Sequence, residues 1–177
     1  MIYFTADTHF NHENVIKYNN RPFDSVRDMN ESLVTSWNAI VKNDDVVYHL
    51  GDFAFGKKDE ITPIFNSLNG KKYLIIGTHD KMGAKMKWVE KNCIREIKIE
   101  GQHIVLCHYA MRVWPRSHYG SWQLHGHSHG GLQPLGRQLD VGVDIHQYKP
   151  VSIDQVTKEM ENKLANVNEM AERQPVL

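Results

Sequence analysis

The sequence contains five short blocks in which aspartate and histidine recur at spacings that suit metal binding. The blocks are Asp7-Thr8-His9, Gly51-Asp52, Gly77-Thr78-His79-Asp80, His108 and Gly126-His127-Ser128-His129. In an extended chain, residues i and i+2 point to the same side, so each D-x-H or H-x-H pair can present two ligands to one place. Carboxylate and imidazole ligands without a thiolate pair favour a divalent ion such as Mn, Fe, Ni or Zn. One carboxylate shared between two ions would allow a binuclear centre.

A short apolar or β-rich segment precedes each block. These predicted strands are Ile2–Ala6, Val46–Leu50, Tyr73–Ile76, His103–Cys107 and Trp122–His125. Sites in open α/β sheets assemble at the carboxyl ends of the strands. One D-x-H or H-x-H pair is more often a turn or a surface histidine, but ligand blocks at five strand ends together predict a metal site.

Stretches with helical periodicity lie between and after the strands. The predicted helices are Ser25–Val41, Asp59–Leu68, Met82–Lys91 and Ser152–Leu164, the last with Ser152 and Gln155 at capping-box spacing. Ile94–Leu106 is expected to form a hairpin about Glu100-Gly101, and Gln138–Ile145 a strand or strand pair. This alternation predicts a mixed α/β fold in one domain, residues 1–165. Residues 166–177 lack apolar periodicity and are expected to fray.

The composition narrows the classes of function. The chain has 177 residues, with 21 Lys and Arg against 21 Asp and Glu, so its formal net charge is zero. A protein that grips long nucleic acid usually carries a basic excess, so extended nucleic-acid binding is not expected. No apolar run approaches the roughly 18 residues of a membrane span, and the N-terminus has no basic leader. With two cysteines and no paired motif, we expect reduced thiols and a cytoplasmic protein.

Histidine is frequent, at 11 of 177 residues, and the histidines outside the blocks need their own interpretation. His49 lies inside an apolar strand and is expected to be a hydrogen-bonded core residue. His125 is expected to be structural or to support the ligands that follow it. His12 closely follows the first block and is expected either to touch substrate or to cap backbone.

In order and spacing, the blocks resemble the calcineurin-like metallophosphoesterase superfamily, whose pattern is D-x-H, GD, GNH-[D/E], a strand-end histidine and GH-x-H. The runs Asn20-Arg21-Pro22-Phe23 and His49-Leu50-Gly51-Asp52-Phe53 are similar to a small single-domain branch of it. The resemblance implies a four-layer αββα sandwich of two mixed β-sheets flanked by helices, with two divalent ions, Mn foremost, at the sheet edge.

The resemblance also implies a role for each block. The implied metal ligands are Asp7, His9, Asp52, Thr78, His108, His127 and His129. Asp52 would bridge the two ions, which would lower the pKa of a bridging water and neutralise phosphate oxygens during hydrolysis of a phosphate ester. His79 would protonate the leaving alkoxide, with Asp80 orienting it.

One block departs from the family pattern, because Thr78 stands where the family has Asn. The hydroxyl of threonine is a shorter and poorer metal ligand than a side-chain amide oxygen. Three interpretations stay open: a natural variant in which a water replaces the ligand, a naturally weakened enzyme, and a deliberate substitution that slows turnover. We favour a weakened or substituted site.

The substrate is predicted from arginine and aromatic residues near the blocks. Those expected to bind it are Arg21, His12, Arg112, Trp114 and Arg116. Guanidinium groups pair with phosphate and aromatic faces stack on bases, so a phosphodiester of nucleotide or nucleic-acid-end type is favoured. The alternatives are a phosphomonoesterase, a nucleotide pyrophosphohydrolase, or a non-catalytic module that binds phosphorylated ligands with its metals. The loop with Trp114 could also simply pack on its own aromatic residues.

Overall fold

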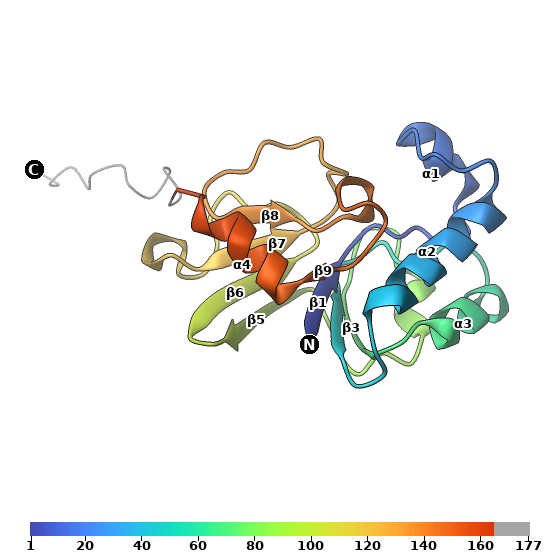
Figure 1. Cartoon of the computed structure of the whole chain (residues 1–177), viewed down its shortest axis with the longest axis horizontal. Coiled ribbons are helices and arrows are strands. Elements are labelled where there is room, and N and C mark those ends of the chain that lie inside the picture. The colour runs from blue at the N-terminus through green and yellow to red at the C-terminus, as the bar shows by residue number, and fades with distance from the viewer. Residues whose placement is uncertain (165–177) are drawn as a thin grey trace, which may run out of the picture.

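Two β-sheets and the helices around them make up the part of the protein that the computed structural model describes, residues 1–164 (Figure 1). The first sheet consists, in chain order, of β1 (Ile2–Thr5), β2 (Val46–His49), β3 (Lys71–Ile75), β4 (Lys91–Asn92) and β9 (Val151–Ser152). The second consists of β5 (Ile94–Ile99), β6 (Gln102–Cys107), β7 (Trp122–His125) and β8 (Gln138–Asp140). Their spatial orders are β4-β3-β2-β1-β9 and β5-β6-β7-β8.

Both sheets are mixed. In the first, β9 pairs antiparallel with β1, while β1, β2, β3 and β4 pair in parallel. In the second, β5 and β6 form the predicted antiparallel hairpin, and β6, β7 and β8 pair in parallel. Glu100 (φ 48°) and Gly101 (φ 88°) both adopt the left-handed backbone that a tight hairpin turn needs. Because β1, β2 and β3 are parallel, their carboxyl ends lie at the same edge of the first sheet.

Two apolar layers hold the sheets in place. Phe4, Leu50, Ile104 and Leu124 belong to the layer between the two sheets. Helices α2 (Val26–Ile40) and α3 (Lys58–Ser67) build the other layer against the outer face of the first sheet. That layer contains Trp37, Phe65, Val47 and Leu74. The predicted α/β class, a sandwich of two mixed sheets with helices, is confirmed.

Helix α4 (Ile153–Glu161) begins at the predicted capping box. Ser152 Oγ accepts the Gln155 N–H (3.2 Å), and Gln155 Oε1 accepts the Ser152 N–H (2.9 Å). The helix packs against β8, β9 and β1 and ends before Leu164, the last residue predicted for it. The tail predicted to fray, 166–177, lies outside the described residues. No helix in the described part is long and apolar enough to cross a bilayer.

The prediction of a helix over Met82–Lys91 is wrong. A single short turn, η1 (Gly83–Lys85), forms there. The Trp88 indole donates to the Gly83 carbonyl (2.8 Å), and the chain then enters β4. The apolar side chains of this segment therefore fill the layer under α3 without a regular helix. The elements α1 (Glu13–Tyr18), η2 (Ser117–Tyr119), β4 and β9 were not predicted. The prediction of strand over Gln138–Ile145 is wrong after Asp140, where β8 ends and the short turn η3 (Val143–Ile145) follows.

Candidate metal centre

The five blocks predicted from the sequence meet where the ends of β1, β2 and β3 face the ends of β6 and β7. Backbone hydrogen bonds tie neighbouring loops together: the Asp7 N–H donates to the Gly51 carbonyl (2.9 Å), and the Gly126 N–H donates to the His108 carbonyl (3.0 Å). Across the sheets, the His127 N–H donates to Asp7 Oδ2 (2.8 Å). Loops from both sheets therefore build one site.

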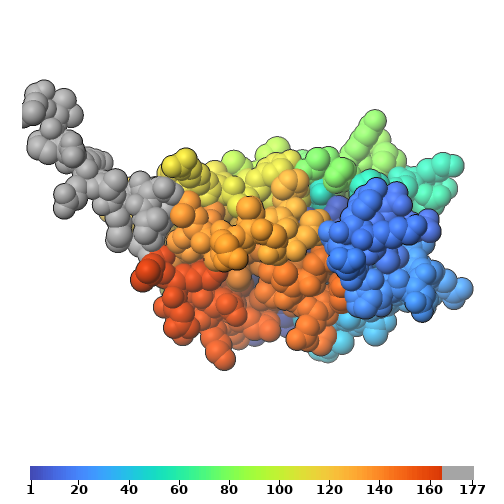
Figure 2. All heavy atoms as spheres, turned by 90° about the horizontal axis from the view of Figure 1, so that it is seen from above, coloured from blue at the N-terminus to red at the C-terminus, as the bar shows by residue number. Residues whose placement is uncertain are grey.

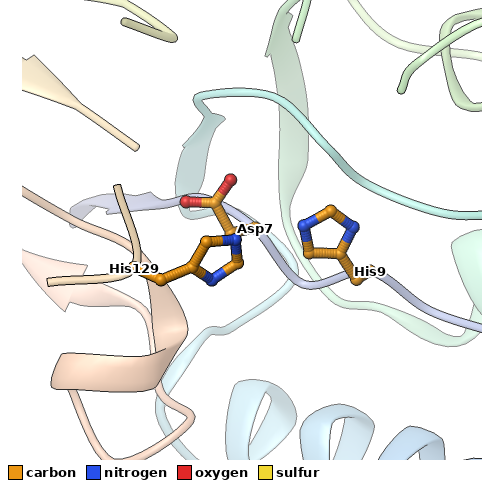
Figure 3. A group of neighbouring side chains, drawn as sticks. All are labelled: Asp7, His9 and His129. Atoms are coloured by element: carbon orange, nitrogen blue, oxygen red, sulfur yellow. The ribbon is translucent and has the colours of Figure 1, made fainter. Parts of the chain in front are cut away.

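Two groups of side chains in this site could each hold a metal ion. They are Asp7, His9 and His129 in the first group and Asp52, His108 and His127 in the second. Within each group, one ligand atom from every residue lies within 4.8 Å of the others. In Figure 3, Asp7 and His9 extend from the loop after β1, and His129 reaches the same space from a distant segment. The division into groups is the one that the family resemblance implies.

Asp52 belongs to the second group and also lies close to the first. Its Oδ2 is 3.8 Å from His9 Nε2 in the first group and 3.6 Å from His108 Nε2 in the second. Its Oδ1 accepts the backbone N–H of His79 (2.7 Å), which fixes the carboxylate plane. One carboxylate oxygen is thus left to face both groups.

Five of the ligand candidates adopt a left-handed backbone. The φ angle lies between 46° and 68° at Asp7, His9, Asp52, His127 and His129. Residues other than glycine rarely adopt this conformation, and such outliers concentrate at functional sites, where the surrounding structure holds them. The backbone of these loops is therefore shaped to aim the ligands at the cost of local strain.

Glycine lets the loops approach one another closely. A Cβ at Gly77 would lie 2.4 Å from Asp52 Oδ1, and one at Gly126 would lie 2.6 Å from Asp7 Oδ2. Both contacts are far below van der Waals separation, so only glycine lets these two carboxylates keep their places.

Several buried polar atoms of the site have no hydrogen-bond partner among the described residues. They include Asp7 Oδ1, His9 Nδ1 and His108 Nε2. Buried polar groups almost always have a partner, because an unsatisfied one costs about 1–3 kcal/mol. Unsatisfied carboxylate and imidazole atoms in residues of both groups fit a divalent cation as the missing partner.

The pKa shifts in the site also fit a bound divalent cation. Burial, together with the nearby carboxylates of Asp140 and Asp52, raises the pKa of Asp7 well above its ordinary value. Burial, aided by the Arg21 charge, lowers the pKa of His9 to about 2. Burial also lowers the pKa of His108. The lowered pKa values of His9 and His108 favour their neutral, metal-binding form, and a cation would favour the ionised form of Asp7.

Arg21 positions the first group and does not reach into the substrate space. Its side chain is 4% exposed, and its donors are used inside the protein. Nε and Nη2 donate to the two oxygens of Asp144 (2.7 and 2.9 Å), and Nη2 also donates to the Asp7 carbonyl (2.7 Å). His129 Nδ1 donates to Asp144 Oδ2 (2.6 Å). The prediction that Arg21 binds substrate is therefore corrected.

Asp144 was not identified from the sequence, although it orients a ligand. Burial alone would raise the pKa of this carboxyl, but the hydrogen bonds from His129 and Arg21 lower it. A carboxylate that accepts from one imidazole nitrogen leaves the other free to bind metal and makes it more basic. The segments involved, far apart in the chain, meet on one face in the space-filling view, where N-terminal residues (blue) lie against residues after β7 (orange) (Figure 2).

His79 and Asp80 follow β3 and have different roles. The His79 ring is exposed and lines the same cavity as the ligands. Asp80 is buried, and its oxygens accept three backbone N–H groups, from Asp52, Phe53 and Gly77, each at 2.8 Å. Asp80 thus holds the loop that carries Asp52 beside the loop that carries His79. The prediction that Asp80 orients the His79 ring is corrected, because its carboxylate is used on backbone.

The Thr78 hydroxyl has a protein partner. It lies 2.8 Å from the hydroxyl of Tyr109, on the rim of the second group. The Tyr109 ring packs edge-on against His108 and His127, with centroid distances of 4.9 and 4.8 Å. Thr78 therefore has a phenol partner beside the second group, and its role as a metal ligand stays a prediction.

The arginine and tryptophan loop between β6 and β7 lies at the wrong end of the sheet for substrate. Trp114 is buried and donates to the Ser121 carbonyl just before β7 begins. Arg116 contacts His103 (3.2 Å), near the start of β6, whereas the ligand His108 follows its end. Trp114 and Arg116 are therefore structural, as in the alternative that this loop packs on its own aromatic residues. Arg112 is exposed on the same loop.

A cavity of about 310 Å³ opens over the ligand groups. It is lined by His9, His12, Val15, Tyr18, Asn19, Asp52, Phe55, His79, His127 and His129. His12 thus faces the cavity, as one of its two predicted roles requires, and its side chain makes no capping bond to α1. The sequence had not marked Tyr18, Asn19 or Phe55. A larger cavity of about 470 Å³, beside Tyr3 and Ser152, contains none of the predicted site residues.

Comparisons with known proteins find relatives and a similar solved structure. No family model matches it. A solved structure, the protein of unknown function AQ665 from Aquifex aeolicus, superimposes with a TM-score of 0.74 and 28% identity over 90% of this chain and 98% of that one. The gene 66 protein of Mycobacterium phage L5 is 33% identical over 81 residues, 44% of this chain and 39% of the phage protein. Uncharacterized protein MJ1445 of Methanocaldococcus jannaschii is 37% identical over 169 residues, 90% of this chain and 91% of its own length. The chain therefore belongs to the same family as MJ1445.

Proposed function

We propose that the protein is a metal-dependent phosphodiesterase that uses two divalent ions, with Mn first among Mn, Fe, Ni and Zn, to hydrolyse a nucleotide-type phosphodiester. The observation that carries the proposal is the place of Asp52 Oδ2, 3.8 Å from His9 Nε2 and 3.6 Å from His108 Nε2. A carboxylate oxygen within reach of both ligand groups suits a ligand shared by two ions. The resemblance to calcineurin-like metallophosphoesterases supplies the class of reaction.

The residues of the chain would divide the work as follows. Two bound ions would supply an activated water and offset the charge of the phosphate oxygens. The ring of His79, exposed in the same cavity, would hold a proton for the departing alkoxide. Asp80, through its three backbone bonds, would keep Asp52 and His79 at a constant separation.

A diester suits the cavity better than a monoester or a pyrophosphate. None of the residues that line it in the described chain is lysine or arginine, so the metals and the proton on His79 would meet the negative charge of the substrate. A phosphate monoester carries a charge of about −1.5 to −2 near pH 7, and a diester carries one negative charge. The lining therefore favours the less charged substrate.

A panel of substrates with added Mn²⁺ tests the proposal. It contains a phosphodiester, a phosphomonoester, cyclic nucleotides and a dinucleotide polyphosphate, each assayed with Mn²⁺ and with a chelator. We expect diester hydrolysis that needs the metal and exceeds monoester hydrolysis. If the metal-loaded protein binds the panel but hydrolyses none of it, the enzyme proposal fails.

Replacement of the shared ligand tests the same proposal at the site. Asp52→Asn should abolish turnover and lower the number of bound ions below two, because an amide is neutral and binds metals weakly. Asp44→Asn, at an exposed aspartate outside the site, is the matched control and should behave as the wild type. Two tightly bound ions and near-normal turnover in Asp52→Asn would show that Asp52 is not shared.

The competing function is a metal-dependent module that binds phosphorylated ligands without hydrolysing them. The observation that favours it is threonine at position 78, because the second group then has no amide ligand there and the Thr78 hydroxyl contacts Tyr109. His79 in the same cavity argues against it, since a pure binding site gains little from a proton donor. Metal-dependent thermal stabilisation by phosphate compounds, with no product formed, would identify this function.

A further inference from the structure

An aromatic wall borders the cavity on the side of α1, formed by Tyr18, His12 and Phe55. The rings of His12 and Phe55 stack with centroids 4.0 Å apart and planes 10° from parallel. Tyr18 meets His12 edge-on at 6.4 Å. The three residues lie in the same cavity as the metal ligands, so a molecule bound to the metals would also meet this wall.

The wall is tied to the site and yet open to a ligand. Tyr18, the last residue of α1, is 73% exposed, although it is a large aromatic residue. The side-chain amide of its neighbour Asn19 lies 2.8 Å from His129 Nδ1, so the end of α1 lies beside the first ligand group. On the other side, Phe55 lies 5.1 Å from the His79 ring. The wall therefore runs from the exposed tyrosine to the proposed proton donor.

The chemistry of the wall selects a flat and uncharged group. One tyrosine ring, one phenylalanine ring and a half-buried histidine offer π faces, and lysine and arginine are absent from the described lining. Aromatic side chains bind nucleobases by stacking, with little dependence on the base. A cavity of about 310 Å³ lies at the small end of ligand sites, which suits one nucleoside with its phosphate and not a long polymer.

We infer that the wall of Tyr18, His12 and Phe55 is a nucleobase subsite, so that the substrates are phosphodiesters with a nucleoside on one side. This inference rests on the proposed function for the place of the phosphate. The inference assigns base recognition to α1 and the segment after Asp52. The loop between β6 and β7, where it was predicted from the sequence, packs at the other end of the second sheet.

Binding to the Mn²⁺-loaded protein tests the subsite without turnover. Calorimetry should give thymidine 5′-monophosphate about tenfold higher affinity than glycerol phosphate, the scale of one base stacked on an aromatic ring. Tyr18→Ala should remove most of this preference and leave the affinity for glycerol phosphate unchanged. The control is Tyr119→Ala. Tyr119 is also exposed (81%) but lies on the loop between β6 and β7, away from the cavity, so this variant should keep the preference. Equal affinities in the wild type, or a preference that survives in Tyr18→Ala, would overturn the inference.

Kinetics separate this inference from the proposed function. The two substrates are dithymidine monophosphate and glycerophosphoglycerol, which are both diesters with aliphatic leaving alcohols. We expect kcat/KM to favour the dinucleotide about tenfold, and Tyr18→Ala to abolish that ratio. Hydrolysis of both substrates with no preference would contradict the nucleobase subsite and support the phosphodiesterase activity. A binding preference without hydrolysis of either substrate would contradict the phosphodiesterase activity and support the nucleobase subsite.

Discussion

Single residues in this site divide into those that would hold ions and those that hold the ligands in place. Asp7, His9 and Asp52 have buried carboxylate or imidazole atoms aimed at common points. Arg21 and Asp144 instead meet ligands through hydrogen bonds, so their effect on function would be indirect. Substitutions of the two kinds should differ, because loss of a ligand removes an ion whereas loss of a supporting residue misplaces one.

His79→Ala separates a proton donor from a metal ligand. The variant should keep the full number of bound ions and lose turnover on esters of poor leaving groups, by about 10²–10⁴-fold for a general acid. A nitrophenyl ester needs little protonation and should lose much less. The measurement is kcat on both esters together with metal content. Equal losses on the two esters, accompanied by loss of metal, would place His79 among the ligands.

Thr78→Asn tests whether the hydroxyl at this position limits the site. An amide oxygen could reach the second group in place of the hydroxyl that now pairs with Tyr109. By analogy with an oxyanion donor, one restored transition-state contact would raise the rate by about 10²–10³-fold, and the gain should be largest at low metal concentration. Metal titration and kcat on one diester measure both effects. No change in either would mean that position 78 is not a ligand position in this fold.

At the scale of an element, the strand β2 carries a neutral histidine into the core. His49 is fully buried, its Nε2 lies 2.9 Å from Thr8 Oγ1, and its Nδ1 accepts the Gly51 N–H (3.2 Å). Because Thr8 Oγ1 donates to the Phe53 carbonyl (2.8 Å), it must accept from Nε2, so the proton is on Nε2. The expectation of a hydrogen-bonded core histidine is confirmed.

His49 should make stability depend on pH. Burial lowers its pKa in the folded state to about 3, below the ordinary value of 6.5. The unfolded chain therefore takes up a proton as pH falls below about 6.5 while the folded chain does not, and stability falls by about 1.4 kcal/mol per pH unit until the folded pKa is reached. The test is urea unfolding of the wild type and of His49→Gln with chelator present. The difference between their free energies of unfolding should be about 2 kcal/mol smaller at pH 5 than at pH 7.5. A difference that stays constant with pH would show that the pKa of His49 is the same in the folded and unfolded chains, and so contradict the lowered value.

At the scale of the whole molecule, each ligand group joins loops from both sheets. His129 follows β7 in the second sheet, whereas Asp7 and His9 follow β1 in the first. Metal should therefore stabilise the sandwich. An ion at 100 times its Kd adds about 2.7 kcal/mol, which is roughly 5–10 °C in Tm for a domain of this size. Thermal scans with Mn²⁺ and with chelator measure the shift, and Asp52→Asn should show a smaller one. An unchanged Tm in the wild type would mean that the groups do not bind Mn²⁺.

The sequence predicted this site better than it predicted its surroundings. The ligands follow buried strands directly, so the α/β pattern alone brings Asp7 and Asp52 to one edge. The Arg21–Asp144 pair joins residues 123 positions apart, and no local pattern signals it. The six residues of α1 are too few for helical periodicity, which hid Tyr18. The arginine and aromatic residues of the loop with Trp114 suggested that it binds substrate, but composition does not show at which end of a strand a loop packs.

The left-handed backbone at the ligands implies a conflict between activity and fold stability. Natural selection for stability alone would replace these residues, because non-glycine side chains in this conformation cost on the order of 1–2 kcal/mol each. His127 is exposed and has a φ of 68°, so His127→Gly removes a ligand without opening the core. In chelator, this variant should unfold at a higher urea concentration than the wild type, although it binds fewer ions. A lower midpoint would mean that the backbone at His127 is not strained. If the proposed reaction were lost in a descendant of this protein, glycine or asparagine would be expected to replace these candidate ligands while the sandwich itself persisted.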